Sequence, residues 1–389
     1  MNAPKLRFKE FNNEWRCFSL EKLVSFSKGN LLSKADLDES GLYPCILYGQ
    51  LYTKYFEVIR NVYSKTNRND KNLIMSKCGD VLIPSSGETP LDISTASCIM
   101  LDNILLGGDI NILSPTNCEG RFLSYMINNN KRKEIAKVAQ GHSVVHLYND
   151  NLKKISINIP QLNEQTKIAD TLELLDKKIE LQSKKIEDLK LFKLYTENNL
   201  LNSSSSIHWK KIKLNDILIE GNKEPVKNTN DFKKITIKLN LNGLEFNESK
   251  REMSDKRPFY IREENEIIIG KQNYFNGSIA IVTKEFSGCI CSNAIMSFKV
   301  KEGYNLKYIY LYLSQKRYMK EREFLANGTG QKELSEKEFL KFTIKVPEDS
   351  VVNNITNIID KINKKINFEN NKLNKLIELK KGLMQSMFV

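Results

Sequence analysis

The sequence is poor in the residues that build metal centres, disulfide frameworks and membrane spans. It has three His and seven Cys, and no two cysteines form a Cys-x-x-Cys pair. An odd number of cysteines, most of them in apolar runs, predicts reduced and buried thiols rather than a disulfide-built fold. No apolar run reaches the length of a transmembrane helix. We therefore expect a soluble, cytoplasmic protein that does not enter the membrane.

Motifs of the common catalytic sites are also missing. The chain has no Gly-x-Gly-x-x-Gly turn between a strand and a helix, no Gly-Lys-Ser/Thr phosphate loop and no Asn/Asp-Pro-Pro-Tyr/Phe tetrapeptide. His142 and His146 lack a third ligand nearby, so loop or nucleic-acid contact is favoured over a metal site. Asp176-x-Lys178 resembles half of a nuclease site, but its helical pattern predicts a solvent-facing pair. We expect a chain without catalysis of its own that binds no metal or cofactor.

Positive charge exceeds negative charge over the whole chain. Sixty Lys and Arg residues against 47 Asp and Glu residues give a net charge of +13 and a pI near 9.1. This balance favours a polyanionic partner, with nucleic acid ahead of membrane. The alternative is a Lys-, Asn- and Ile-rich composition without any such partner. The length of 389 residues and 40% hydrophobic content fit two or three domains with real cores.

The second half of the chain repeats the plan of the first half about 187 residues later. Pro160 falls on Pro347 and Lys193 on Lys380 without a gap between them. Short strand-like runs and one helical stretch follow in the same order in both halves. Such a duplication predicts a pseudo-two-fold molecule, which suits a bipartite target such as duplex DNA.

Two long charged segments carry the clearest part of the repeat. Apolar residues step by fours and threes in both, which predicts two helices with a coiled-coil seam. The seam positions are Ile168, Leu172, Leu175, Ile179, Ile186 and Leu189 in the first, and Ile355, Ile359, Ile362, Ile366, Leu373 and Leu376 in the second. Because a lone helix of this kind gains little stability, the two are expected to pair with each other. Antiparallel pairing is favoured, since it separates the lobes that precede the helices.

Antiparallel pairing has a consequence near the middle of both helices. Gln182 and Glu369 occupy the same heptad slot and would come close together. They would form a polar layer that fixes the register, or both would be solvated. The fold class is thus α+β, with two mixed α/β domains separated by two long antiparallel coiled-coil helices. The expected boundaries are 1–160 and 203–347 for the domains, and 161–202 and 348–389 for the helices.

Polar loops between strands are the best candidates for contacts with DNA. Gln and Asn can bond adenine bidentately, Lys can reach guanine, and Ser and Thr suit phosphates. The alternative is that such residues fill ordinary surface turns. Their occurrence at equivalent points of both halves favours DNA contact. The candidates are Ser85, Ser86, Thr89, Gln140, His142 and Ser143 in the first half, and Lys271, Gln272, Asn273, Tyr274, Asn276, Thr329, Gln331 and Lys332 in the second.

The chain resembles the specificity subunit of type I restriction–modification systems over its whole length. The most specific residues are a strand-ending proline, a Glu-Gln pair, Ile-Ala, Leu-Asp and a Leu-Lys-rich helix end. In the first half these are Pro160, Glu164-Gln165, Ile168-Ala169 and Leu175-Asp176, followed by IEDLKLFK. The second half keeps Pro347, Ile355, Lys364-Lys365-Ile366 and ELKKGLMQSMF, and Gly141 and Gly328 resemble a turn of that family. It departs at Val351-Val352, which replaces Glu-Gln and puts any contact there in doubt.

This resemblance implies a defined role. The family has two target-recognition domains held apart by the helices, and each domain reads one half of a split, asymmetric DNA site. The helices bind two modification subunits, which carry S-adenosylmethionine and methylate adenine at N6. Restriction subunits then join to translocate and cleave DNA, with Mg²⁺ and ATP. This chain would itself be non-catalytic and bind no cofactor.

Two other classes of function stay open. One is a non-catalytic coiled-coil protein that organises DNA or an assembly without base specificity. Salt-sensitive binding without sequence preference would indicate this class. The other is a stand-alone enzyme with an unrecognised site, which activity of the purified chain would indicate. The missing motifs argue against the enzyme, and only the family resemblance argues against the scaffold.

Overall fold

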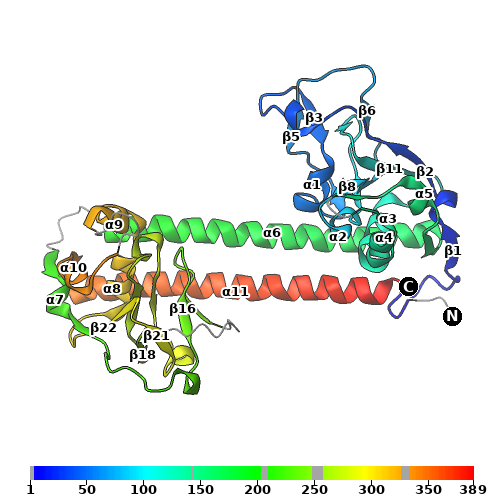
Figure 1. The fold of residues 1–389 in the computed structure, drawn as a ribbon. Helices are drawn as coiled ribbons and strands as arrows, with labels where there is room; N and C mark the ends of the chain where they lie inside the picture. Colours follow the sequence, from blue (N-terminus) through cyan, green and yellow to red (C-terminus); the bar gives the residue numbers. More distant parts are fainter. Residues whose placement is uncertain (1–3, 142–143, 203–208, 248–256, 326–332) are drawn as a thin grey trace. The chain divides into compact units, whose positions relative to one another are not determined.

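The chain divides into two compact units that each combine a β-rich lobe with parts of two long helices. The computed structural model describes residues 4–141, 144–202, 209–247, 257–325 and 333–389. Unit 1 comprises Met1–Lys185 with Glu369–Val389, and unit 2 comprises Ile186–Phe368. In Figure 1 the lobe of unit 1 is blue to cyan and that of unit 2 is green to orange.

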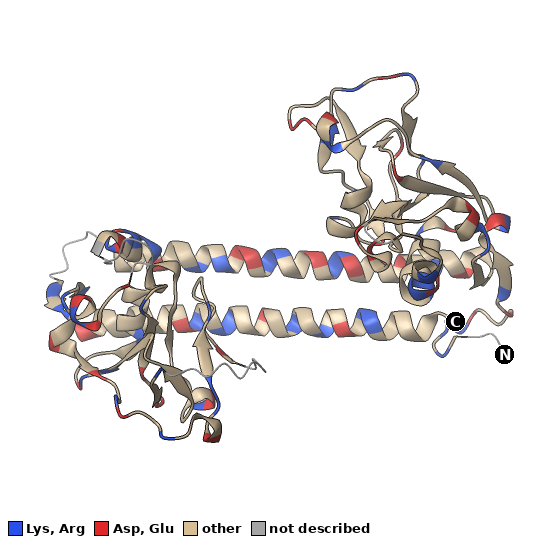
Figure 2. Ribbon diagram, in the orientation of Figure 1, with Lys and Arg blue, Asp and Glu red and all other residues tan. Residues whose placement is uncertain are grey.

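The long helices are α6 (Leu162–Leu201) and α11 (Asp349–Met387). Each follows a strand that ends at a buried proline, Pro160 or Pro347, which cannot extend the strand's hydrogen bonds. Acidic residues in the first turns favour both starts, because the helix dipole is positive there. Figure 2 shows basic and acidic residues interspersed along both helices, as is typical of helices with one solvent-facing side.

Unit 1 is built on two sheets and two strand pairs. The five-stranded sheet has the order β2 (Val24–Lys28), β11 (Ile110–Pro115), β7 (Val81–Pro84), β9 (Ser97–Ile99) and β4 (Val58–Ile59). The four-stranded sheet has the order β5 (Ser64–Thr66), β3 (Tyr43–Ile46), β10 (Leu105–Leu106) and β6 (Ile74–Met75). The antiparallel pairs are β1 (Arg16–Ser19) with β13 (Ser156–Ile159), and β8 (Ser86–Gly87) with β12 (Val145–His146).

Short helices cover these sheets. They are α1 (Tyr48–Thr53), α2 (Pro90–Ile93), α3 (Gly120–Met126), α4 (Arg132–Val138) and α5 (Asn149–Lys153), with single turns η1 (Leu20–Lys22) and η2 (Lys34–Asp36). A π-helical turn, η3 (Ile127–Lys131), joins α3 to α4. The helical stretch predicted from the sequence over 121–140 is therefore confirmed.

Unit 2 has a smaller version of the same plan. Its four-stranded sheet has the order β15 (Leu218–Glu220), β22 (Ile295–Val300), β19 (Ile267–Gly270) and β20 (Ile279–Ile281). The antiparallel pairs are β14 (Lys210–Lys213) with β23 (Thr343–Val346), β16 (Ile235–Ile237) with β17 (Leu244–Phe246), and β18 (Phe259–Ile261) with β21 (Ile290–Ser292). The helices are α7 (Leu214–Ile217), α8 (Leu306–Leu313), α9 (Lys316–Lys320) and α10 (Glu336–Leu340), with turns η4 (Thr229–Asp231), η5 (Tyr274–Asn276), η6 (Lys284–Phe286) and η7 (Glu323–Leu325).

Each lobe contains a central strand, β7 or β19, whose two faces are both covered by apolar clusters. In β19, Ile267 and Ile269 join the core that packs on the long helices, whereas Ile268 joins a separate cluster on the opposite face. In β7 the successive residues Val81 and Leu82 belong to two different clusters in the same way. Successive side chains of a strand point to opposite faces, so a strand covered on both sides reads as a continuous apolar run. This explains the apolar runs in the sequence.

The two long helices run antiparallel within each unit. In unit 1, Leu172 near the start of α6 shares a core cluster with Phe388, just beyond the end of α11. In unit 2, Leu201 at the end of α6 shares a cluster with Val352 and Ile355 near the start of α11. The α+β architecture with two mixed domains and two long coiled-coil helices is confirmed, and the two-fold relation between the units stays a prediction.

The proposed seam residues lie on the covered side of the two helices. Ile168, Leu172, Leu175, Ile186, Ile355, Ile359 and Ile366 are buried. Ile179, Leu189, Ile362, Leu373 and Leu376 are half-buried. Buried and half-buried positions therefore both occur along the seam, and Ile186 and Ile366 near the middle of the helices are among the buried ones.

Gln182 and Glu369 form a buried polar layer between the helices. Their exposed fractions are 6% and 1%. The Gln182 amide donates to Glu369 Oε2 at 2.7 Å and to the Glu369 carbonyl at 3.0 Å. Lys185 Nζ lies 2.8 Å from the other carboxylate oxygen. The polar-layer interpretation is confirmed, and the alternative of two solvated side chains is wrong.

A double-mutant cycle tests this layer. Gln182→Leu is expected to destabilise the chain by about 1–3 kcal/mol, because a buried carboxylate loses a hydrogen-bond donor. Adding Glu369→Leu should recover most of this loss, since two apolar side chains can replace a buried polar pair at little cost. Urea unfolding measures both. Ser183→Ala on the exposed face is the control, and additive losses from the two leucines would argue against the layer.

Asp176 is not solvent-facing, contrary to the prediction from its helical pattern. The Tyr125 hydroxyl donates to Asp176 Oδ2 at 2.5 Å, and Lys380 Nζ lies 2.7 Å from Oδ1 and 2.9 Å from Glu57 Oε2. Burial raises the pKa of Asp176. The prediction failed because the lobe of unit 1 packs over this side of α6, which periodicity within one helix cannot show.

Most cysteines of the described residues are buried. Cys45, Cys98, Cys118, Cys289 and Cys291 are buried free thiols as predicted, whereas Cys17 and Cys78 are exposed. Within the described ranges, no helix is both long and apolar enough to span a membrane. No group of three or more His, Cys, Asp or Glu side chains in this part of the chain could hold a metal ion.

Candidate nucleic-acid interface

The two polar loops predicted in unit 1 come together through β8 and β12. His146 pairs with Ser86 in the antiparallel register, and the Leu147 amide donates to the Ser85 carbonyl at 2.9 Å. Gly141, four residues before β12 in the chain, has a φ of 119°. A Cβ there would lie 2.1 Å from the Val144 carbonyl oxygen, so only glycine fits.

Unit 2 repeats this arrangement with different residues. The Leu334 amide donates to the Lys271 carbonyl at 2.9 Å, as Leu147 does to Ser85. The loop that begins with Lys271 therefore occupies the place of the loop that begins with Ser85. The remaining candidates, His142, Ser143, Thr329, Gln331 and Lys332, lie outside the described residues.

The structure divides the candidates of unit 1 by their exposure. Ser85 and Ser86 are buried in the lobe, which corrects their placement on an exposed loop. The reason is that β8 pairs with β12 and is packed against the helices α1 and α2. Thr89 is exposed and caps α2: its side chain accepts from the Asp92 amide at 3.2 Å. Gln140 is exposed, and its backbone bridges that of His146.

Tyr274 is a core residue of unit 2, and this too corrects the prediction. Its hydroxyl donates to the Leu313 carbonyl at 2.8 Å, and its ring packs 5.6 Å from that of Phe339. Burial raises its pKa well above the ordinary value. Tyr274 anchors the loop from inside, while Asn276 donates to Asn273 Oδ1 at 3.2 Å on the outside. The loop is therefore anchored to the core through Tyr274, and two of its outer side chains are hydrogen-bonded to each other.

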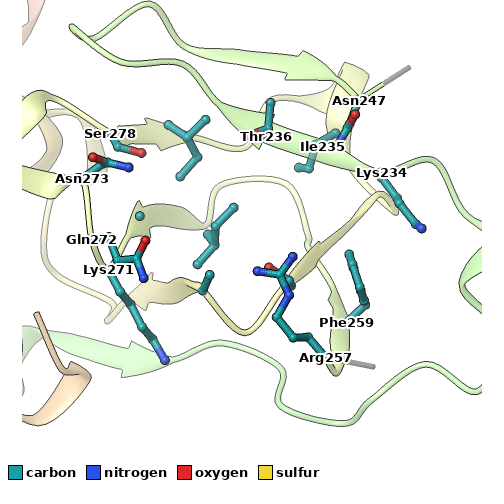
Figure 3. A pocket seen from close by; sticks show the side chains of 15 residues that line it. Lys234, Ile235, Thr236, Asn247, Arg257, Phe259, Lys271, Gln272, Asn273 and Ser278 are labelled. Atoms are coloured by element: carbon teal, nitrogen blue, oxygen red, sulfur yellow. The ribbon is translucent and has the colours of Figure 1, made fainter. Parts of the chain in front are cut away.

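Lys271, Gln272 and Asn273 line one side of a groove in unit 2. Figure 3 shows them facing a second wall that carries Lys234, Asn247 and Arg257. The volume of this open groove is about 460 Å³. The complete lining, here called the basic groove, is Lys234, Ile235, Thr236, Ile237, Asn247, Arg257, Phe259, Gly270, Lys271, Gln272, Asn273, Ser278, Ser292, Ala294 and Ile295.

The electrostatics of the basic groove favour an anionic ligand. Its described lining has three basic residues and no acidic one. Lys271 Nζ lies 3.6 Å from Glu336 Oε1, and Lys223 pairs with the other oxygen of Glu336. The Lys271 side chain is therefore oriented by a carboxylate that is not part of the groove lining. Lys234 Nζ lies 5.1 Å over the Phe259 ring. Oriented cations beside exposed amides can contact phosphates and base edges together.

Sequence reasoning missed the second wall of the groove. Lys234 precedes β16, Asn247 follows β17 and Arg257 precedes β18. A basic pair directly before the alternating run Ile235–Ile237 was the available signal for a strand whose end carries charge. Nothing in the sequence showed that this hairpin would face the loop after β19.

Comparison with known proteins supplies the family. The type I restriction modification DNA specificity domain matches residues 12–191 and again 207–379. A type I restriction–modification S subunit from M. genitalium has a similar structure, with a TM-score of 0.64 and 17% identity over 100% of this chain and 99% of that one. A second chain, from a structure describing complex assembly and conformational transition of the type I R-M system, has a TM-score of 0.55 and 12% identity over 97% and 98%.

No curated protein matches the sequence. The family match, in contrast, covers nearly the whole chain and falls twice, once on each half of the repeat. The chain therefore belongs to the type I restriction–modification DNA specificity domain family.

Proposed function

We propose that this chain is the DNA specificity subunit of a type I restriction–modification complex and reads a bipartite, asymmetric site. The supporting observation is that two lobes of one plan present different residues at the same point. The Leu147 amide bonds the carbonyl of Ser85, which begins a segment that exposes Thr89. The Leu334 amide bonds the carbonyl of Lys271, which begins a loop that exposes Gln272 and Asn273. Unlike loops on like frameworks suit two unlike half-sites.

In this proposal the two walls of the basic groove contact different parts of the DNA. The amides of Gln272 and Asn273 bond adenine edges in the major groove, where bidentate contacts discriminate between bases. Lys234 and Arg257 on the facing wall bond phosphates and set the register. The exposed Gln272 side chain, which makes no hydrogen bond within the described residues, is free for such a contact.

We also infer that the helices dock two modification subunits, which carry S-adenosylmethionine and methylate adenine at N6. Leu181 and Phe368 are 58% and 63% exposed and occupy equivalent positions of the repeat, as do the exposed Phe192 and Leu379. Large apolar side chains exposed on helices indicate interaction surfaces. Equivalent pairs in both units suit two copies of one partner. Restriction subunits would add ATP- and Mg²⁺-dependent translocation and cleavage.

Co-expression with candidate modification subunits tests this function. Genome-wide mapping of methylated adenine should then reveal one motif with two unlike halves and a constant gap. Methylation without such a motif, or salt-sensitive DNA binding without sequence preference, would favour a DNA-organising scaffold instead.

Substitutions in the two lobes should act on different half-sites. Gln272→Ala is expected to relax reading of one half-site by about 1–3 kcal/mol, and Gln140→Ala should relax only the other. Lys234→Ala should weaken binding to all sequences equally. It should also reduce the slope of the logarithm of the binding constant against the logarithm of salt concentration by about one. Competition binding with single-base variants of the mapped site measures these effects. An equal loss for every sequence in Gln272→Ala would reduce that residue to a phosphate contact.

A further inference from the structure

In unit 1 the start of α6 is covered by the segment that precedes β1. Arg7 Nε and Nη2 donate to Glu164 Oε1 and Oε2, both at 2.8 Å. The Trp15 indole also donates to Glu164 Oε1 at 3.4 Å. Phe8 packs against the core of this lobe, with Lys167 Nζ 4.7 Å over its ring. Adjacent basic and aromatic residues, Arg7 and Phe8, thus cover the start of α6 in unit 1. This region is here called the corner of the unit.

Unit 2 lacks the carboxylate that bonds Arg7 and Trp15 in unit 1. The repeat places Val351 and Val352 where Glu164 and Gln165 stand in unit 1. Trp209, the counterpart of Trp15, has a buried indole N–H without a hydrogen-bond partner in the described chain. A buried donor left unpaired is unfavourable, which marks this corner as incomplete.

A pocket of about 330 Å³ lies at this corner, at the start of α11. The apolar part of its lining, here called the floor, includes Ile212, Pro347 and Val352, and the basic Lys210 also lines the pocket. Glu348 and Asp349 are exposed at the same pocket, where Gln161 and Leu162 stand in unit 1. The acidic charge that is buried at Glu164 in unit 1 therefore lies on an accessible rim in unit 2.

The sequence directly before Trp209 does not repeat the segment around Arg7. The stretch 202–208, which precedes Trp209, reads NSSSSIH and contains neither Arg nor Phe. We propose that the pocket at the start of α11 binds a peptide segment of a partner protein, in which a basic residue adjoins an aromatic one. The acidic rim receives the basic side chain, and the apolar floor receives the ring. Unit 1 shows the arrangement with its own chain.

A peptide taken from this protein is the appropriate probe. The synthetic peptide of residues 4–14, PKLRFKEFNNE, is titrated into the full chain carrying Trp15→Phe, so that Trp209 is the remaining indole. Saturable change in the Trp209 emission is expected. The peptide with Arg7→Ala should bind at least about tenfold more weakly, because it lacks the charge for the rim.

Variants of the chain locate the binding. Glu348→Lys with Asp349→Lys should weaken the peptide at least about tenfold, whereas Glu285→Lys, an exposed acid outside the pocket, should not. Urea midpoints equal to that of the parent chain verify that the variants fold. No saturable binding up to millimolar peptide would overturn the proposal. So would binding that is unaffected by the rim substitutions, which would place the peptide elsewhere, as at its own site in unit 1.

Discussion

Replacing Leu172 by Asp is expected to destabilise unit 1 by more than about 4 kcal/mol. Leu172 is 0% exposed and packs in one cluster with Ile168, Phe122 and Phe388. The substitution removes a buried leucine, which alone costs about 2–5 kcal/mol, and adds a carboxylate without a partner. Trp15 lies in the same cluster, so its fluorescence in a Trp209→Phe background measures the loss during urea unfolding.

The chain contains its own control for this result. Leu174, on the same turn of α6, is 57% exposed, and Leu174→Asp should change stability by no more than about 0.5 kcal/mol. The counterpart of Leu172 in the repeat is Ile359, which is buried in the core of unit 2. Ile359→Asp should be equally damaging there, with Trp209 as the reporter. Equal midpoints for Leu172→Asp and Leu174→Asp would contradict the helix packing described above.

Lys380→Met is expected to cost about 3 kcal/mol at neutral pH, because it leaves two largely buried carboxylates without their cation. Lys380 on α11 pairs with Asp176 on α6 and with Glu57 of the lobe. Burial opposes its charge, yet Glu57 and Asp176 raise the pKa of Lys380. Lys381→Met, at an exposed position of the same turn, is the control and should be nearly neutral.

The loss in Lys380→Met should depend on pH. The pKa of Asp176 is raised by burial above its value in the unfolded chain. Ionised Asp176 therefore destabilises the fold as pH rises through and above the ordinary aspartate range near about 4. Lys380 reduces this penalty, so without it the deficit should grow from about pH 4 to about pH 7. Urea midpoints at both pH values measure it, and a deficit that is the same at both would exclude this cause.

The helices were predictable because their signal is local and occurs twice. The heptad steps of Ile168, Leu172 and Leu175 return at Ile355, Ile359 and Ile362, so the two patterns support one interpretation. The matching slot of Gln182 and Glu369 followed from the same periodicity. The prediction for Asp176 failed because the heptad pattern of α6 reports only the side that faces α11. The lobe of unit 1 covers a second side of α6, which this pattern does not reveal.

The candidate site was only partly predictable. The sequence indicated Gln272 and Asn273, and the structure leaves both exposed on the basic groove. It could not indicate that Tyr274, in the same polar loop, turns inward to the Leu313 carbonyl. Neighbours in a loop have no fixed periodicity, so the sequence does not tell which of them are buried.

By itself, then, the sequence determined the duplication, the paired long helices and the equivalent positions of Ser85 and Lys271 in the two lobes. These features depend on periodicity and on residues close together in the chain. Tertiary structure alone decided that a hairpin carrying Lys234 and Asn247 faces the loop of Lys271. It also decided that Arg7 and Trp15 both bond Glu164 in unit 1, whereas the Trp209 indole N–H of unit 2 has no partner among the described residues. Both depend on contacts between residues far apart in the sequence, which no local pattern encodes.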